Sequence, residues 1–361
     1  MSERTEKDDP DSAAAACPIC GGSAALAYTA GDYHYGIPGR FSVHRCGQCQ
    51  HLFQWPMPSE DELGWYYPGE YYSFQPPTVD ARPHALRRRG LGPLAHYAGL
   101  RRGYRHLRRF PNPLLALLGW RLARLRPDIV LPRFVAGGTL CDFGCGAGAN
   151  VAVMQYLGWN ASGIDASATA AAAGRRAGLN IIEGSAEVLE CRPEAFDAIV
   201  AAHSVEHVPD AARLFGAFYT ALKPGGTLAI EVPNAAAAAL ALYGQYYYYL
   251  TLPLHVHIFS PSSLRLLAQR HGFTEIATRT ASRWRTHAAS WLVRRDVERG
   301  KVAAQFKNHP RWQNQLARIP ALIGYLRSLQ SGRGDCLQLV CRRPAEPGAL
   351  NRVARFQEES L

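Results

Sequence analysis

Residues 138–165 hold the feature that most constrains the fold of this chain. An apolar stretch runs into a glycine-rich turn, then a helix-forming stretch, a second apolar stretch and an acid. Gly144, Gly146 and Gly148 lie where the chain must turn sharply, and glycine lets a ligand approach the backbone because it has no Cβ. The helix that follows presents free N–H groups at its start. Asp165 is placed to accept both hydroxyls of a ribose, so the pattern predicts a nucleotide-binding α/β unit.

The glycine-rich turn by itself also fits the fingerprint G-x-G-x-x-G/A of dinucleotide-binding dehydrogenases. The sequence downstream decides between the alternatives. Residues 184–187 form a turn with an acid after a short third strand, and residues 196–202 form an apolar fourth strand. The string HSVEH at 203–207 follows that strand, and a helix stop and turn at 222–226 precede a fifth strand at 227–234.

This succession, over roughly residues 137–283, resembles the class I S-adenosylmethionine-dependent methyltransferases. Five motifs in register are more specific than one glycine turn, which disfavours a dehydrogenase. The resemblance implies an α/β fold with a Rossmann-like sheet of seven strands. Its last strand, expected at Asp335–Arg342, inserts antiparallel between the fifth and the sixth, and we expect helical insertions around the sheet.

The resemblance also implies roles for single residues. Asp142 and the backbone of 144–148 would hold the methionine end of S-adenosylmethionine, Asp165 the ribose, and Ala186 with Glu187 the adenine. A carboxylate near the ammonium group of the cofactor is electrostatically favourable. The candidate cofactor-binding residues are Asp142, Gly144, Gly146, Gly148, Asp165, Ala186, Glu187 and His203.

Four of the nine cysteines form two C-x2-C pairs that are 25 residues apart. Each pair directs two thiolates at one point, and together they make the tetrahedron that Zn²⁺ prefers. Disulfides or buried free thiols are the alternatives, which a cytoplasmic chain disfavours. We therefore predict a small N-terminal zinc ribbon with a structural Zn²⁺. Its expected ligands are Cys17, Cys20, Cys46 and Cys49.

The 361-residue chain is long enough for one α/β domain and a smaller companion. Its acidic start lacks an apolar signal core, which predicts a cytoplasmic protein. The expected parts are a disordered tail (1–16), the ribbon and a connector (17–80), a basic helical segment (81–136), the methyltransferase domain (137–344, with a helical insertion at about 284–330) and a second tail (345–361).

Residues 51–74 resemble the region that joins a zinc ribbon to the methyltransferase domain in bacterial enzymes that modify sugars, surface polysaccharides or secondary metabolites. This resemblance implies a small-molecule or saccharide-like acceptor.

Residues 81–133 carry thirteen arginines and a single acid, Asp128. Three interpretations stay open for this stretch: a solvated helical scaffold, a surface for anionic membrane or a lipid-linked substrate, and a nucleic-acid contact. Arginine stems also cover apolar surface well, which favours the scaffold. The membrane alternative would place the protein peripherally at the inner membrane face.

The string His203-x-x-Glu206-His207 can put three donor groups on one helical face. In the ubiquinone-pathway O-methyltransferases and the small-RNA 2′-O-methyltransferases, the matching positions hold Glu-x-x-Glu-His and bind a divalent metal. His203 replaces the first Glu, which removes an oxygen ligand that Mg²⁺ would prefer. Two alternatives therefore stay open at these residues: a second metal ion, or a site without metal.

Residues 235–260 follow the fifth strand, where this fold builds its acceptor pocket. Tyr243 and Tyr246–Tyr249 offer aromatic walls with hydroxyl tips. His255 and His257 alternate, so one can face the pocket while the other packs. The candidate catalytic residues are His207 and His255, because an imidazole has a suitable intrinsic pKa for a general base.

The sequence thus predicts a methyltransferase that acts on an oxygen, nitrogen or carbon of a small or saccharide-like acceptor. One rival is an RNA methyltransferase that grips nucleic acid through its ribbon and arginines. A second rival is a non-catalytic binding module that retains the cofactor fold. The ribbon has no basic cluster between its cysteine pairs, which favours the small acceptor.

Overall fold

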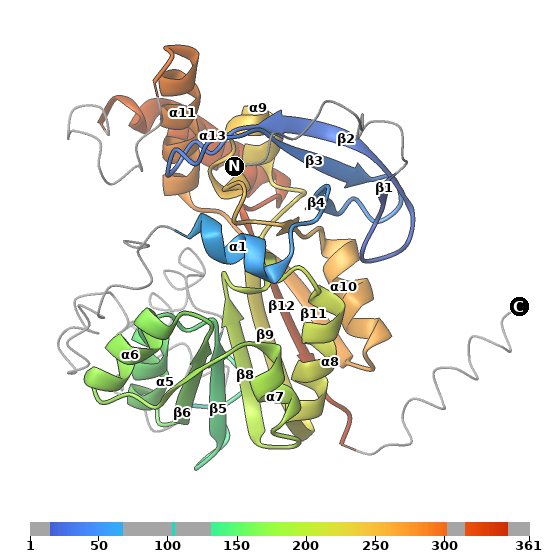
Figure 1. Ribbon diagram of the computed structural model, residues 1–361, viewed down its shortest axis with the longest axis vertical. Helices are drawn as coiled ribbons and strands as arrows, with labels where there is room; N and C mark the ends of the chain where they lie inside the picture. Colours follow the sequence, from blue (N-terminus) through green and yellow to red (C-terminus); the bar gives the residue numbers. More distant parts are fainter. Residues whose placement is uncertain (1–14, 68–102, 105–130, 302–314, 346–361) are drawn as a thin grey trace, which may run out of the picture.

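A computed structural model describes residues 15–67, 103–104, 131–301 and 315–345. Its strands form a seven-stranded and a five-stranded sheet. Figure 1 shows the two sheets arranged along the long axis, with helix α1 (Glu60–Tyr66) between them. Most of the predicted basic segment, 81–136, and most of both predicted tails lie outside the described residues.

The larger sheet has the order β11-β12-β9-β8-β5-β6-β7. Strands β5 to β9 are parallel, whereas β12 runs antiparallel to both β9 and β11. This topology confirms the predicted Rossmann-like sheet with its antiparallel last strand. The strands are β5 (Thr139–Phe143), β6 (Asn160–Asp165), β7 (Ile181–Glu183), β8 (Phe196–Ala202), β9 (Leu222–Pro233), β11 (Thr274–Ala281) and β12 (Cys336–Arg342).

Helices cover both faces of this sheet, as the nearly continuous apolar sequence of its parallel strands requires. Helices α7 (Ala186–Glu190), α8 (Ala211–Ala221) and α10 (Pro261–Arg270) pack on one face. On the other face lie α5 (Ala149–Tyr156) and α6 (Ala168–Arg176). Helix α10 begins at a capping box formed by Ser260 and Ser263.

Strand β9 begins earlier than the sequence predicted. The stretch 222–226 was expected to be a helix stop and turn, and α8 does end at Ala221. Leu222 nevertheless pairs with Phe196 of β8, with a register shift before the regular pairing resumes. Gly225 keeps the left-handed φ of 77° that a turn requires. The turn is therefore an irregular start of the strand.

The smaller sheet has the order β1-β2-β3-β4-β10. Four of its strands come from the N-terminal cysteine region: β1 (Ala15–Ala16), β2 (Ser23–Ala30), β3 (Phe41–Cys46) and β4 (Leu52–Gln54). The fifth, β10 (His257–Ile258), comes from the stretch after β9, and its His257 lies opposite Phe53 of β4. The ribbon sheet is thus completed by the chain that carries the candidate residue His255.

The segment between β9 and β10 contains α9 (Ala238–Tyr243) and two short 3₁₀ helices, η4 (Gly244–Tyr246) and η5 (Tyr248–Leu250). Between β11 and β12 lie α11 (Trp284–Glu298) and α13 (Arg318–Ser331). No helix within the described ranges has both the length and the apolar character needed to cross a bilayer.

Candidate functional site

The glycine-rich turn connects β5 to α5 at the carboxyl end of the sheet. Gly144, Gly146 and Gly148 all have left-handed φ angles, of 69°, 54° and 87°. A Cβ at Gly144 would lie 2.2 Å from the Cβ of Ser204, and one at Gly148 would lie 2.6 Å from Cδ1 of Leu179. Two of the three glycines are therefore required by close packing as well as by backbone conformation.

Asp165 ends β6 and holds the turn against that strand. Its Oδ2 accepts a hydrogen bond of 2.6 Å from the backbone N–H of Gly146, and its Oδ1 accepts one of 3.0 Å from the N–H of Ser167. Burial raises the pKa of this carboxyl. Asp165, which is predicted to bind the ribose, therefore lies beside the glycine-rich turn. Its hydrogen bonds also hold the turn in place.

Asp142 lies within β5 and is almost completely buried, with 2% of its surface exposed. Its Oδ1 accepts a hydrogen bond of 3.0 Å from Nδ2 of Asn150, whereas Oδ2 has no partner within the described part of the chain. Burial, with a contribution from the charge of Asp165, raises the pKa of Asp142 to about 7. A buried carboxyl with a free oxygen would be stabilised by a cationic ligand group.

Ala186 and Glu187 are the first two residues of the short helix α7, which follows the predicted turn. Ala186 is buried, and Glu187 is exposed. The Oε1 of Glu187 accepts a 2.6 Å hydrogen bond from the N–H of Ser185. In this conformation the Glu187 side chain satisfies a free donor at the helix start.

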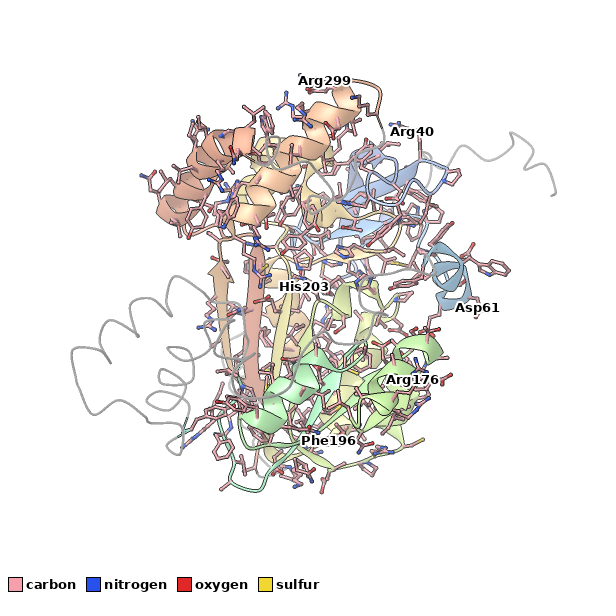
Figure 2. The ribbon with its side chains drawn as sticks, turned by 90° about the vertical axis from the view of Figure 1, so that its left-hand side faces the viewer. Arg40, Asp61, Arg176, Phe196, His203 and Arg299 are labelled. Atoms are coloured by element: carbon pink, nitrogen blue, oxygen red, sulfur yellow. The ribbon has the colours of Figure 1, made fainter. Side chains whose placement is uncertain are left out.

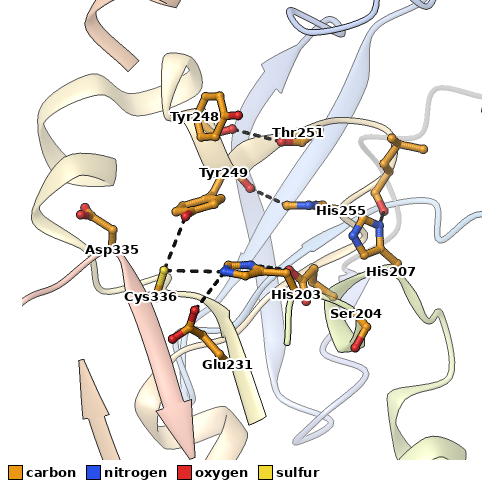
Figure 3. A network of polar contacts seen from close by, with 12 residues as sticks. His203, Ser204, His207, Glu231, Tyr248, Tyr249, Thr251, His255, Asp335 and Cys336 are labelled. Carbon is orange, nitrogen blue, oxygen red and sulfur yellow. Dashed lines mark hydrogen bonds and ion pairs between the residues drawn. The ribbon is translucent and has the colours of Figure 1, made fainter. Parts of the chain in front are cut away.

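His203 follows β8 and has an unusual left-handed φ of 54°. Its Nδ1 lies 3.1 Å from Oε1 of Glu206, and its Nε2 lies 3.3 Å from Oε1 of Glu231. The ring stacks on Tyr249 with centroids 5.2 Å apart (Figure 3). Although burial disfavours the charged ring, its hydrogen bonds to Cys336, Glu206 and Glu231 hold the pKa of His203 well above its usual value.

Sequence reasoning missed the partners of His203 on β9 and β12. Glu231 is buried within β9, where it also binds Arg283 and Gln338 through side-chain hydrogen bonds. Cys336 begins β12, and its Sγ lies 3.9 Å from Nε2 of His203. One signal was available, because Glu231 is the single acid of β9 and lies between apolar residues, and a buried charge requires a partner.

His207 and His255 are 48 positions apart, and the fold brings their rings to 4.6 Å in an edge-to-face arrangement. Nδ1 of His207 lies 3.0 Å from the carbonyl oxygen of Leu254, and also 3.0 Å from the hydroxyl of Tyr67. Nδ1 of His255 lies 2.7 Å from the carbonyl oxygen of Tyr249. Because a carbonyl only accepts, both Nδ1 atoms carry the proton, which leaves both Nε2 atoms with a lone pair. Burial lowers the pKa of His207 to about 4 and that of His255 to about 3.

Glu206 completes this pair of imidazoles as a third donor. It is fully buried, and its Oε2 has no partner among the described residues. The ligand atoms of Glu206, His207 and His255 lie within 4.8 Å of one another. One carboxylate and two imidazoles, each oriented by a backbone carbonyl, fit a divalent transition metal. His203 belongs to a separate group with Glu231 and Cys336, and the ligand atoms of these three residues also lie within 4.8 Å of one another.

The four cysteines of the two C-x2-C pairs form one cluster. The Sγ atoms of Cys17 and Cys49 are 3.6 Å apart, and those of Cys20 and Cys46 are 3.3 Å apart. All four are free thiols. Four converging sulfur atoms are the donor set of a closed structural zinc site, and the residues present fit that ion.

The cysteine cluster is connected directly to the larger domain. The hydroxyls of Ser260 and Ser262, at the start of α10, both donate to the carbonyl oxygen of Cys49. Nε2 of His51 lies 3.0 Å from Nδ1 of His257, which is fully buried. His257 therefore packs against the ribbon, whereas His255 faces His207.

The tyrosines after β9 divide into two groups. Tyr243 and Tyr247 are buried in a cluster that includes Val43 of the ribbon, so they pack rather than line a pocket. Tyr246, Tyr248 and Tyr249 are only partly buried. Two of the five tyrosines of the predicted aromatic wall therefore belong to the core that they share with the ribbon.

Residues 108–278 match a protein family described as a methyltransferase domain. The match covers slightly less than half of the chain, and the order and direction of the seven strands are those of the methyltransferase fold.

Among curated proteins, the chain is 33% identical over 158 residues to a ubiquinone biosynthesis O-methyltransferase of Xanthomonas campestris pv. campestris (strain B100), covering 40% of this chain and 63% of that protein. The chain thus spans slightly less than two thirds of that relative. Another protein of the same name, from Brucella anthropi, is 29% identical over 208 residues, covering 54% of this chain and 84% of the relative. Among solved structures, a SAM-dependent methyltransferase from Archaeoglobus fulgidus is 18% identical with a TM-score of 0.41, covering 63% of this chain and 93% of that one.

Proposed function

We propose that this protein transfers the sulfonium methyl group of S-adenosylmethionine to an oxygen of a small-molecule acceptor. The contact between the glycine-rich turn and Ser204 carries the proposal. Because β5 and β8 are neighbours in the sheet, the turn after β5 packs on the segment that leads to Glu206 and His207. A cofactor held at the turn would therefore lie next to the cluster of Glu206, His207 and His255.

In this proposal the free oxygen of Asp142 faces the ammonium of the cofactor, and Asp165 accepts hydrogen bonds from the ribose. Ala186 and Glu187 flank the adenine, which requires Glu187 to release the N–H of Ser185 or to share it. His203 was a candidate cofactor contact from sequence. We propose instead that it positions Glu206, because both of its ring nitrogens already face carboxylates.

Methyl transfer is an in-line displacement. The acceptor oxygen forms a bond to the methyl carbon while the bond from carbon to sulfur breaks, and the acceptor hydroxyl loses its proton. Alignment of the two reactants supplies much of the rate. A group with a pKa of about 3 or 4 is a weak base at neutral pH, so His207 and His255 are poor proton acceptors by themselves.

The same two imidazoles are well suited to hold a divalent metal, because they are neutral at physiological pH and each offers a free Nε2. When bound, such an ion would lower the pKa of an acceptor hydroxyl. We therefore propose His207, His255 and Glu206 as the ligands, with Tyr67 and the Leu254 carbonyl orienting His207.

The finer acceptor class that we propose is saccharide-like. The resemblance of residues 51–74 to the connector in enzymes that modify sugars and polysaccharides supports it. Tyr246, Tyr248 and Tyr249 support it too, since partly exposed tyrosines offer an aromatic face with a polar tip. We also propose one structural Zn²⁺ at the cysteine cluster, which is consistent with a reducing, cytoplasmic location.

Metal and ligand analysis of the purified full-length protein tests these proposals together. We expect S-adenosylhomocysteine to bind more tightly than NAD, and we expect two metal ions per chain. His207→Ala and His255→Ala should each lose one ion and keep the zinc, whereas His271→Ala, which alters the histidine directly after α10, should lose neither. Tighter binding of NAD, or metal contents unchanged in both variants, would contradict the proposals.

The acceptor class has its own test. The protein is incubated with methyl-labelled S-adenosylmethionine and with separate small-molecule and RNA fractions of cells that produce it. We expect label in the small-molecule fraction. Label only in RNA would replace the proposed acceptor with nucleic acid.

A further inference from the structure

Helix α13 is apolar on two opposite sides. The side packed against α11 consists of small residues, namely Ala317, Ala321, Gly324 and Ser328. A Cβ at Gly324 would lie 2.4 Å from Nδ1 of His287 on α11, so the two helices approach each other closely. The large aliphatic side chains are between 45% and 72% exposed: Leu316, which precedes the helix, and Ile319, Leu322, Ile323, Leu326 and Leu329 on the opposite side of α13.

This arrangement reverses the usual pattern of a surface helix, which turns its large apolar residues toward the core. At 3.6 residues per turn, the five exposed aliphatic residues within α13 occupy one arc of about 120°. Arg318 and Arg327 lie at the two edges of that arc. An apolar arc bordered by arginines is the composition of a helix that lies in the interface of a membrane.

We propose that Leu316 and the five exposed aliphatic residues of α13 dock on the surface of an anionic lipid bilayer. The charge of the segment carries the choice of partner. Residues 315–333 contain Arg318, Arg327 and Arg333 but no acid. Arginine stems can extend along the apolar layer while their guanidinium groups reach lipid phosphates.

A second copy of the chain is the main alternative occupant. Antiparallel pairing of two α13 helices would bring the arginine edge of one copy against the arginine edge of the other. No acid on α13 is available to neutralise them. Charge therefore favours lipid over self-association.

The position of α13 relates the docking face to the candidate site. Helices α11 and α13 lie together at the end of the molecule far from β6 and β7 (Figure 1). Figure 2 shows His203 at the level between these helices and the lower part of the sheet. Arg283, the residue before α11, binds Glu231 of the His203 network. Docking through α13 would hold the acceptor side of the site toward the membrane.

Vesicle binding tests the proposal without cofactor or acceptor, so its result is independent of the proposed methyl transfer. The full-length protein is sedimented with phosphatidylcholine vesicles that contain roughly one third phosphatidylglycerol. We expect Leu322→Gln/Leu326→Gln to weaken binding by at least about tenfold, because two apolar side chains lose their burial in lipid. Arg318→Gln/Arg327→Gln should weaken it by about tenfold or more.

Leu26→Gln/Val135→Gln is the matched control, since both residues are apolar and exposed to a similar degree but lie outside α13. It should bind as the parent does. Unchanged binding by the leucine variant would overturn the proposal and would point to another part of the chain. A parent dimer that the leucine variant converts to a monomer, with no vesicle binding by either, would assign the face to self-association. Equal binding to pure phosphatidylcholine would overturn the requirement for anionic lipid.

Discussion

The two halves of the candidate site are built in different ways. The cofactor half comes from neighbouring stretches of chain, since Asp142, the glycine-rich turn and Asp165 lie within 24 residues and Ala186 and Glu187 follow the next strand. The acceptor half combines Tyr67 from the end of α1, Glu206 and His207 after β8, and His255 beside β10. One half depends on local backbone geometry and the other on how distant segments pack.

The two halves also differ in charge. The cofactor half holds carboxyls whose pKa values are raised by burial, and such groups favour a cationic ligand. The acceptor half holds two imidazoles kept neutral by burial and oriented by carbonyl oxygens. We infer that the cofactor half recognises a charged group, whereas the acceptor half presents lone pairs.

Loss of the ribbon's metal should disturb the structure of the acceptor half far more than that of the cofactor half. Cys46→Ser should lose the proposed zinc and lower the free energy of unfolding by about 3 kcal/mol or more, because three thiolates leave the coordination shell open. Strand β10 pairs with the ribbon, so the segment around His255 should lose protection in hydrogen exchange. Titration calorimetry should still detect S-adenosylhomocysteine.

Cys191→Ser is the control for this experiment, because Cys191 is exposed and lies outside the cluster. Full zinc content in Cys46→Ser would remove the ribbon site. Complete loss of cofactor binding would show that the two halves are not separable.

Asp165→Ala should weaken the cofactor half of the site and leave the acceptor half intact. It removes charge-assisted hydrogen bonds to a ribose and also releases the N–H of Gly146, so cofactor affinity should fall by about 2 kcal/mol or more. Glu183→Ala, at the end of the neighbouring strand β7, is the matched control and should bind normally. Calorimetry with S-adenosylhomocysteine measures both. Equal affinity of Asp165→Ala and the parent protein would show that Asp165 has no ligand role.

Asp142 should make the stability of the ligand-free protein depend on pH. Its carboxyl has a pKa of about 7 in the folded chain against a usual value of 3.8. Between these values the folded state retains a proton that the unfolded state has lost, so this residue lowers stability as pH rises, up to about 7. Above that pH its contribution is constant.

Asp142→Asn should therefore unfold at a higher temperature than the parent at pH 8, and should bind the cofactor more weakly. Thermal unfolding from pH 5 to 8 provides the comparison, with Glu183→Gln as an exposed control. A parallel pH dependence in Asp142→Asn and the parent would contradict the raised pKa.

The smallest expected effect concerns the junction of ribbon and methyltransferase domain. Ser262→Ala removes a hydrogen bond of 2.7 Å to the carbonyl oxygen of Cys49, which should cost about 1 kcal/mol. Ser331→Ala, which removes an exposed hydrogen bond on α13, should cost less. Denaturant unfolding measures both, and a single transition is expected in each. Two separate transitions would show that the ribbon unfolds independently.

The seven-stranded fold could be predicted because its signals are local. Glycines in a turn, an acid after a strand and a capped amphipathic helix each depend on a few neighbouring residues. The antiparallel insertion of β12 came from the resemblance to a family rather than from those signals. The stretch 222–226 shows the limit of local reasoning, since pairing with Phe196 extends β9 into a predicted turn.

The candidate site was predicted only in part. His207 and His255 were chosen from sequence, but their tautomers depend on the carbonyls of Leu254 and Tyr249. His203 was placed with the cofactor residues, whereas the structure places it between Glu206 and Glu231. Periodicity indicates that a residue is buried, but it does not indicate which distant residue it contacts.

The sequence by itself determined most strands and helices of the α/β domain, the glycine-rich turn and the grouping of four cysteines, because each follows from short-range conformational or chemical preference. Only the tertiary structure decided that β10 completes the ribbon sheet and that Tyr67 reaches His207. It also decided that α13 turns its large aliphatic residues outward. These features depend on how separate segments pack together, and that packing is set by the whole chain rather than by any local stretch.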